Sequence, residues 1–266
     1  MKYLYSNPER NHIIIKGREE VFRNFIDSDY NGMKHKVRNS ISPNSEDALT
    51  WSCFEALSHL PLDLKIAALD EILEDSYEGK CNFSFSANKY SEKEIQIFVG
   101  KKYSVEINKK ESTEVDASIE LPDKLIFIEA KLYSSISLAD EKKSHDQIAR
   151  KLRVGLGCEE CKNREFYFIF LDIAPPDMLL KYTREKKSKE NALNKSPKKW
   201  KSAWWFKYYK YGRRKSLKPL TESLNGIKVE SIEKVSENMG WLTWSDLYKN
   251  ILRGLIKYLQ QVKETN

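Results

Sequence analysis

The sequence of 266 residues predicts an α/β fold in which helices flank a mixed β-sheet. Residues 113–131 alternate apolar and polar side chains with the period of two that marks β-strands, and a turn divides the stretch into two antiparallel strands. Residues 165–173 are almost continuously apolar, which is typical of a strand covered on both faces inside an α/β sheet. Helical patterns precede the first stretch and separate it from the second.

The N-terminal part of the chain, residues 1–43, is weakly patterned and is expected to be an extension of the main domain. Ser45 or Asn44 is suited to cap a helix over residues 46–60, and Pro61 ends it. A second helix is expected over residues 62–73. Glu46 lies in the first turn of the first helix, where an acid complements the helix dipole.

The turn between the two strands of residues 113–131 determines which residues face each other. Pro122 excludes a tight two-residue turn, because its φ angle is fixed near about −65°. A four-residue loop over 121–124, built on a type I turn, fits the sequence. Opposed residues then have numbers that add to 245, and one face of the hairpin is apolar throughout: Val115, Ala117, Ile119, Ile126, Ile128 and Ala130. Residues 94–99 predict a further strand, with residues 103–107 as its expected pairing partner.

This register places two acids against each other, since Asp116 faces Glu129 while Glu114 faces Lys131. Opposed side chains have Cβ atoms about 4.5–5.5 Å apart, where like charges repel. A divalent cation between Asp116 and Glu129 explains the pair, because hard cations take oxygen ligands. The alternative is a surface ladder of charged pairs with Glu114 and Lys131 as a salt bridge, although such ladders favour opposite charges throughout.

The helix after the hairpin carries two polar candidates. It follows a loop over residues 134–140 and ends near Gly155 or Gly157. Ser144 and Gln147 match a capping box, in which Gln147 bonds back to the helix start. Arg150 lies on the same helical face and is suited to hold a phosphate, whereas His145 is expected at the surface.

Positive charge is concentrated in one segment of the chain. The net charge is +7, but residues 181–218 contain 15 Lys or Arg and only 2 Asp or Glu, so the remainder carries −6. Such asymmetry indicates a polyanionic partner bound by the basic segment.

The same segment contains an aromatic helix, which is expected to start at Ser196 and Pro197 and to stop at Gly212. Its aromatic residues cover about two-thirds of the circumference, more than a simple amphipathic helix buries. Base stacking and phosphate contact then combine on one helix and the residues after it: Lys198, Lys199, Lys201, Trp204, Lys207, Arg213 and Arg214. The alternative is a core helix with solvated lysines.

The remaining features concern the compartment. No stretch approaches the roughly 18 consecutive apolar residues of a membrane span, and the N-terminus lacks the pattern of a secretory signal. A cytoplasmic location without a membrane partner is therefore expected. Four cysteines are too few for a disulfide scaffold. Cys158 and Cys161 form a lone CxxC pair, for which incidental, metal-linked and redox roles stay open.

Asp116, followed by Glu129-Ala130-Lys131 at the end of an apolar strand, resembles the signature of the PD-(D/E)XK nuclease superfamily. The order strand, hairpin, helix, strand resembles its restriction-endonuclease-like core and extends the likeness over about residues 44–173. One departure is that Glu114-Val115 stands where the family name has a proline. The resemblance implies a Mg²⁺ or Mn²⁺ ion held by Asp116, Glu129 and the Ala130 carbonyl, with help from Glu46. It also implies a catalytic role for Lys131, which would orient or deprotonate the attacking water and offset developing charge on the phosphate. As the alternative to the capping box, it implies that Gln147 faces the catalytic cleft.

The expected organisation is therefore a nuclease core over residues 44–178, a basic aromatic helical segment over 179–240, and a C-terminal helix over 241–266 that packs on the core. By this resemblance the chain is a metal-dependent endonuclease, acting on DNA rather than RNA, in host defence, mobile-element or repair biology. Two alternatives are a non-catalytic nucleic-acid-binding module and a protein-docking subunit. A homodimer or a larger complex stays open.

Overall fold

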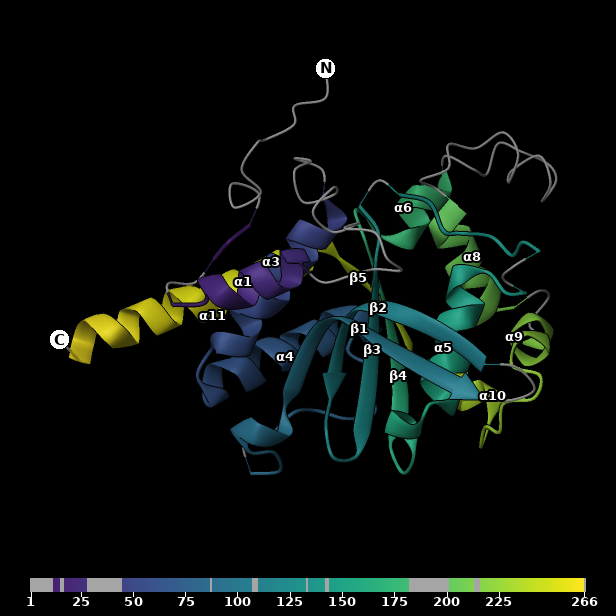
Figure 1. Cartoon of the computed structure of the whole chain (residues 1–266), viewed down its shortest axis with the longest axis horizontal. Helices are drawn as coiled ribbons and strands as arrows, with labels where there is room; N and C mark the ends of the chain where they lie inside the picture. Colours follow the sequence, from purple (N-terminus) through teal and green to yellow (C-terminus); the bar gives the residue numbers. More distant parts are fainter. Residues whose placement is uncertain are drawn as a thin grey trace, which may run out of the picture.

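A computed structural model of the chain describes residues 12–14, 17–27, 45–86, 88–106, 110–132, 134–141, 144–181, 201–212 and 216–265, which are arranged around a five-stranded mixed sheet (Figure 1). The strand order is β1-β2-β3-β4-β5. Strands β1 (Gln96–Glu106), β2 (Lys110–Glu120) and β3 (Lys124–Ala130) are antiparallel neighbours. Strands β4 (Glu165–Asp172) and β5 (Met239–Thr243) continue the sheet parallel to β3. The predicted α/β class, with helices flanking a mixed sheet, is confirmed.

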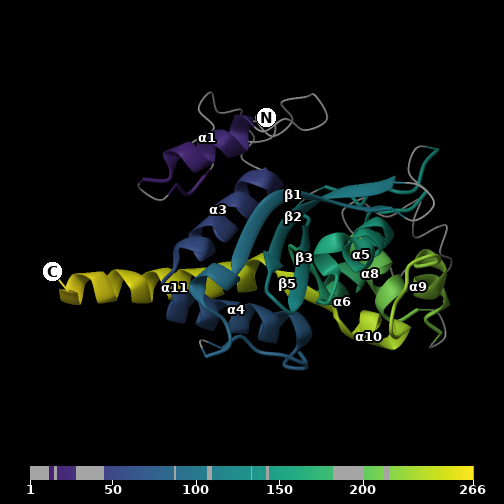
Figure 2. The ribbon, with the colours of Figure 1, turned by 60° about the horizontal axis from the view of Figure 1, so that its bottom comes forward.

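Helices cover both faces of the sheet (Figure 2). One face packs on α3 (Glu46–His59), α4 (Leu62–Tyr77) and α11 (Trp244–Thr265). The other packs on α5 (Gln147–Gly157), α6 (Pro176–Lys181), α8 (Lys201–Lys210), α9 (Lys218–Ser223) and α10 (Ile232–Glu237). Both parallel crossovers step in the same direction across the sheet, so right-handed connections place their helices on the same face. Helix α1 (Glu19–Asp27) packs on α3, and two short 3₁₀ helices are η2 (Glu92–Glu94) and η3 (Glu159–Cys161).

The expected pairing of residues 94–99 with 103–107 is wrong, because β1 is one continuous strand that pairs along its length with β2. Gly100 lies inside this strand rather than in a turn, with φ of 69°, a conformation that favours glycine. Beyond this point, side chains of the same alternating series pack against the other face of the sheet. Ala117 packs in the core beside α3 and α4, whereas Val115 packs in the core beside α5, although the sequence alternation put both on one face.

The closure of the second hairpin and the first four pairs of its predicted register are confirmed, whereas the expected pairs Asp116–Glu129 and Glu114–Lys131 are not part of the ladder. The type I turn stays a prediction. The Leu121 amide donates to the Lys124 carbonyl at 2.9 Å, and the pairs from Glu120–Leu125 to Ala117–Ile128 follow the expected register. The ladder ends at that point. The Ala130 amide donates to Asp116 Oδ2 at 2.7 Å, while the Lys131 amide donates to the Leu171 carbonyl of β4 at 2.7 Å. Strand β3 thus leaves β2 where Asp116 and Glu129 lie.

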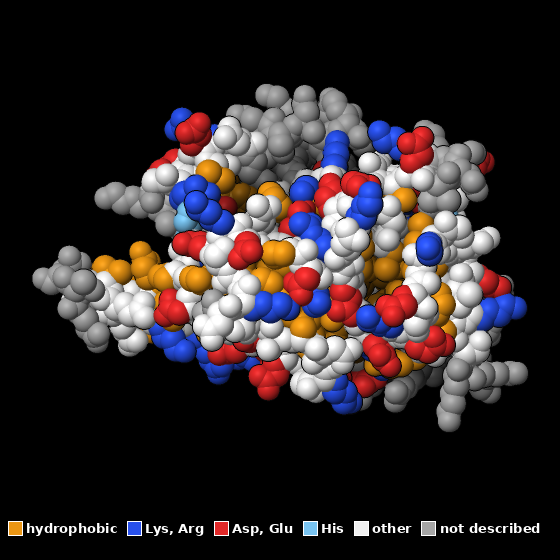
Figure 3. All heavy atoms as spheres, turned by 90° about the horizontal axis from the view of Figure 1, so that it is seen from below, with side chains coloured by type: hydrophobic (Ala, Val, Ile, Leu, Met, Phe, Trp, Pro, Cys, Tyr) orange, Lys and Arg blue, Asp and Glu red, His pale blue; other side chains and the backbone are white. Residues whose placement is uncertain are grey.

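The C-terminal region differs from the expected boundaries, since residues 239–243 form β5 and the boundary between 240 and 241 falls inside it. Thr243 caps α11, because its hydroxyl accepts the Asp246 amide at 3.1 Å. The end of α11 projects from the body with Leu252, Ile256 and Leu259 exposed (Figure 1). Acidic and basic side chains alternate over the face seen in Figure 3. No helix within the described ranges is long and apolar enough to cross a membrane.

Gly155 allows α5 to lie close to β4. A Cβ atom at this position would lie 2.1 Å from Phe166 Cε2, so a Gly155→Ala variant has to push the helix and the ring apart. We expect a loss of about 1–3 kcal/mol of unfolding free energy in urea titrations, the usual cost of overpacking. A Phe166→Leu background should reduce this penalty. An equal penalty in both backgrounds would contradict the contact.

Candidate active site

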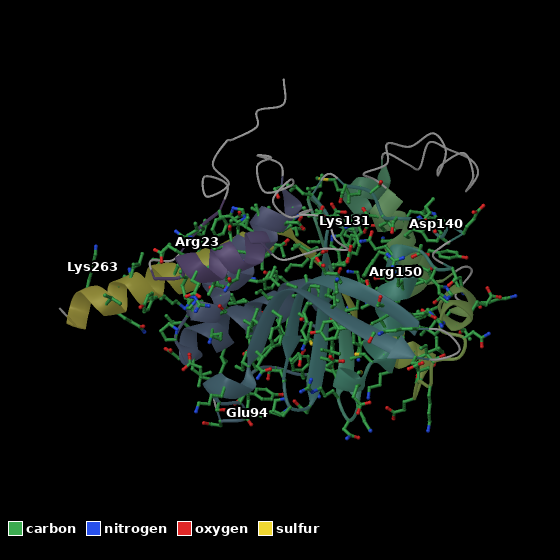
Figure 4. The ribbon with its side chains drawn as sticks, in the orientation of Figure 1. Arg23, Glu94, Lys131, Asp140, Arg150 and Lys263 are labelled. Atoms are coloured by element: carbon green, nitrogen blue, oxygen red, sulfur yellow. The ribbon has the colours of Figure 1, made fainter. Side chains whose placement is uncertain are left out.

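Asp116, Glu129 and Lys131 meet at one end of the sheet. Lys131 follows β3 directly, Asp172 ends the neighbouring β4, and Trp244 follows β5. The carboxyl ends of parallel strands are where α/β sheets bind ligands. In Figure 4 Lys131 lies at this end of the molecule, and Glu94 marks the opposite end. The three residues lie close together, as the hairpin register indicated, and their catalytic and metal-binding roles stay predictions.

The Glu129 carboxylate is fully buried, forms ion pairs with two lysines and accepts one hydrogen bond. Lys131 Nζ lies 2.8 Å from its Oε1 oxygen, and Lys151 Nζ lies 2.7 Å from its Oε2 oxygen. Gln147 Nε2 also donates to Oε1. Burial raises the pKa of Glu129, but the charges of Lys131 and Lys151 outweigh it and lower the pKa to about 2. Glu129 is therefore an ionised carboxylate at neutral pH.

Lys131 is a buried ammonium ion with oxygen atoms on several sides. Its Nζ atom donates to the Ala130 carbonyl at 2.8 Å and lies 3.3 Å from Glu46 Oε1, in addition to Glu129. Burial lowers the pKa of Lys131, but the charges of Glu129 and Glu46 raise it by more, so the net shift is upward. The Trp244 indole donates to the Lys131 carbonyl at 3.0 Å and fixes the backbone here.

Asp116 titrates in the opposite direction from Glu129. Desolvation, followed by the charge of Glu129, raises the pKa of Asp116 to about 8. Its Oδ2 oxygen still accepts the Ala130 amide at 2.7 Å, so the side chain is held beside the end of β3. Opposite shifts are what two neighbouring carboxyl groups show when they repel each other and only one forms ion pairs, here Glu129 with Lys131 and Lys151.

Gln147 faces the cluster, and the capping-box interpretation is wrong. Asp146 caps α5 instead, since its carboxylate accepts the amides of Ile148 at 2.9 Å and Ala149 at 3.1 Å. Gln147 is thereby free to donate to Glu129 while its own oxygen accepts the Ser137 amide at 3.1 Å. The side chain bridges the loop before α5 and the buried carboxylate.

Glu46 belongs to the cluster through Lys131. Ser45 caps α3 as predicted, accepting the Ala48 amide at 3.1 Å, and this places Glu46 at the helix start. The Glu46 Oε2 oxygen accepts the Leu132 amide and the Ser134 hydroxyl, both at 2.7 Å. These contacts favour a role in holding Lys131 and the segment after β3. The expected metal role of Glu46 stays a prediction.

Two residues of the cluster were missed in the sequence. Lys151 stands four residues after Gln147, on the same face of α5, and this spacing was a usable signal. Asp172 ends β4 beside the end of β3, where its oxygens accept the Ile173 amide at 2.7 Å and the Ser202 hydroxyl of α8 at 2.6 Å. Burial raises the pKa of Asp172 to about 6.

The residues expected to bind nucleic acid are only partly described. Trp204 stacks on Tyr208 with ring centroids 4.9 Å apart, and Lys207 pairs with Asp177. Arg150 donates to the His145 carbonyl at 3.2 Å and to Ser137 Oγ at 3.4 Å. Lys201 begins α8, without a described side chain. Four of the predicted residues lie outside the described ranges: Lys198, Lys199, Arg213 and Arg214.

Other parts of the aromatic helix and the CxxC pair are buried. Phe206 and Tyr209 belong to the core beside α5, so the core-helix interpretation holds for this side of α8. Gly212, with φ of 64°, follows the helix end as predicted. Cys158 and Cys161 are free, buried thiols, and burial raises their pKa values to about 12 and 11. As neutral thiols they are poor nucleophiles, and the metal-linked interpretation stays a prediction.

The oxygen atoms around Lys131 are of the kind that Mg²⁺ takes. Glu129 Oε1 and the Ala130 carbonyl both contact its ammonium group, and Asp116 lies on the other side of the Ala130 amide. Two carboxylates and a carbonyl suit a hard divalent cation and leave positions for water and a phosphate oxygen. The donor chemistry therefore fits Mg²⁺ or Mn²⁺. No group of three or more His, Cys, Asp or Glu side chains arranged for a metal occurs among the described residues.

Comparisons of the chain with protein families, with curated proteins and with solved structures found no match. The chemistry of the cluster has to indicate the function. It combines two carboxyl groups of opposite pKa shift with two buried ammonium groups, one from the end of β3 and one from α5. Such a set is suited to hold a cation and an anionic group side by side.

Asp172→Asn should stabilise the protein in a pH-dependent way. The folded pKa of about 6 exceeds the ordinary 3.8, so ionising Asp172 costs nothing below about pH 4 and its full cost above pH 6. We expect equal stability at pH 4 and a gain of about 1–3 kcal/mol at pH 8, measured by urea unfolding. Exposed Asp63→Asn is the control. A gain of the same size at both pH values would contradict the burial argument.

Proposed function

We propose that this protein is a metal-dependent nuclease that hydrolyses phosphodiester bonds, in DNA rather than RNA. The observation that carries the proposal is the cluster at the end of β3, in which Asp116 and Glu129 lie beside the Lys131 ammonium group. The order of antiparallel hairpin, helix and parallel strand supports a restriction-endonuclease-like core. Gln147, which contacts Glu129, supports the same assignment.

The carboxylates supply the metal ligands in this proposal. Asp116, Glu129 and the Ala130 carbonyl would hold the Mg²⁺ or Mn²⁺ ion. The bound ion lowers the pKa of water and stabilises charge on the phosphate. Asp116 has to release its proton to become a ligand, because its pKa is raised to about 8 in the absence of an ion. Gln147 keeps Glu129 oriented through its amide group.

Lys131 acts as a hydrogen-bond donor in this proposal. Its raised pKa keeps the side chain protonated, which favours charge stabilisation on the phosphate over removal of a proton from water. Glu46 Oε1 lies 3.3 Å from the same ammonium group and would help to hold it. Of the roles that the sequence predicts for Lys131, the proposal keeps that of a hydrogen-bond donor and drops that of a base.

In this proposal the basic aromatic segment, residues 179–240, binds the nucleic acid. The Ser202 hydroxyl of α8 donates to Asp172 at the end of β4, so α8 is attached directly to the strand edge that holds the cluster. Trp204 and Tyr208 follow Ser202 by two and six residues and so lie on the side of α8 turned away from Asp172, where a nucleic-acid strand could stack on them. A cytoplasmic location and a homodimer or larger complex stay predictions.

Loss of the cluster residues should abolish cleavage. We expect Asp116→Asn, Glu129→Gln and Lys131→Met each to slow cleavage by about 100-fold or more, because each removes a ligand or a transition-state donor. The assay incubates linear, circular and single-stranded DNA, and RNA, with Mg²⁺ or Mn²⁺. Asp123→Asn, in the turn between β2 and β3, is the control and should cut as the wild type does.

The proposal fails if the wild type cuts no substrate that these variants leave intact. Salt-sensitive DNA binding without cleavage would favour the non-catalytic nucleic-acid-binding module. A shift in size-exclusion elution with a protein partner, without salt-sensitive DNA binding, would favour the docking subunit.

Stacking and charge on α8 should be separable in binding assays. Trp204→Ala is expected to weaken binding of a single-stranded oligonucleotide about tenfold with an unchanged salt dependence, since stacking contributes about 1–3 kcal/mol per base. Lys207→Ala should instead reduce the slope of log affinity against log salt by about 0.7. Fluorescence anisotropy at several salt concentrations measures both, with Lys263→Ala on α11 as the control. Identical effects of both variants would contradict the assignment.

A further inference from the structure

Lys151 is a second buried ammonium group on Glu129, and the proposed mechanism does not use it. Its side chain is 3% exposed, and its Nζ atom lies 2.7 Å from Glu129 Oε2. The same nitrogen donates to the Glu114 carbonyl of β2. A buried lysine loses its hydration, so two hard oxygen atoms on one ammonium group indicate a place built for a cation.

The two lysines occupy equivalent positions around one carboxylate. Lys131 lies between Glu129 Oε1 and the Ala130 carbonyl, whereas Lys151 lies between Glu129 Oε2 and the Glu114 carbonyl. Two-metal phosphodiesterases hold two cations about 3.5–4 Å apart to stabilise the attacking and leaving oxygens. In this protein the Lys151 ammonium group, which belongs to α5, contacts the Oε2 oxygen of Glu129, where a second cation would bind in a two-metal site.

The net charge of the cluster is consistent with the binding of one divalent cation. With Glu46, Asp116, Glu129 and Asp172 ionised, Lys131 and Lys151 leave the cluster at −2. One divalent cation then brings the cluster, without substrate, to zero. A second divalent cation would leave two uncompensated positive charges in a buried site, which is strongly unfavourable.

We propose that Lys151 takes the place of a second divalent cation, so that each chain binds a single Mg²⁺ or Mn²⁺ ion at this cluster. The inference rests on the proposed nuclease function and deepens it, because it makes hydrolysis a one-metal reaction. Lys151 is a positioning residue: it fixes Glu129 and supplies charge without touching the substrate.

The test is the number of Mn²⁺ ions bound per chain at pH 8, counted from the electron paramagnetic resonance signal of free Mn²⁺ and by isothermal titration calorimetry, with no substrate present. Wild type should bind one ion. Lys151→Ala frees Glu129 Oε2 and the Glu114 carbonyl and should bind two. Lys151→Arg keeps the charge and should bind one. Lys65→Ala removes a lysine that is equally buried, in α4 and paired with Glu92, and should also bind one.

Three results overturn the inference: two ions in wild type, two ions in Lys151→Arg, or one ion in a Lys151→Ala protein that is folded by circular dichroism. If Lys151→Ala does not fold, the counts for wild type and Lys151→Arg decide. A wild type that binds no ion at all refutes the metal-dependent nuclease itself. A wild type that cuts DNA and binds two ions refutes only the role of Lys151.

Discussion

The ionised carboxylate of Glu129 is the group on which the rest of the site depends. An ion buried without partners costs several kcal/mol, so the fold has to bring charged donors to it. Lys131 comes from the end of β3, and Lys151 comes from α5 together with the neutral donor Gln147. The ionisation of Glu129 is therefore coupled to the position of α5 on the sheet. Gly155, where the helix approaches Phe166 closely, is part of the same constraint.

The pairing of β2 with β3 ends where Asp116 and Glu129 lie. A backbone amide in a buried strand needs an acceptor, and for Ala130 that acceptor is the Asp116 side chain. Gly100 allows β1 to change direction beside this point through its positive φ. Without a cation the two acids avoid repulsion because Asp116 keeps a proton while Glu129 is ionised by its lysines. Without a metal ion, a proton on Asp116 therefore reduces the repulsion between the two acids, as the metal ion would in the proposed function.

The sequence predicted those parts of the fold that depend on local geometry. Pro122 restricts the turn, and the period of two then determines the hairpin register. The cluster of Asp116, Glu129 and Lys131 follows from that register. Strand β5 was missed because five residues show no period, and only packing beside β4 makes them a strand. Lys151 and Asp172 were missed because their partners lie on elements far apart in the chain.

The contacts of Lys131 relate cation binding to charge stabilisation on the phosphate. Glu129 Oε1 and the Ala130 carbonyl, which now hold its ammonium group, are the same oxygens that the proposed cation takes. Lys131 would have to leave these two oxygens for the proposed cation to be held by them. Glu46 then remains as its carboxylate partner, and it is fixed by the Leu132 amide and the Ser134 hydroxyl. The displaced ammonium group would stay beside the site, charged and held from one side only, as a donor to a phosphate requires.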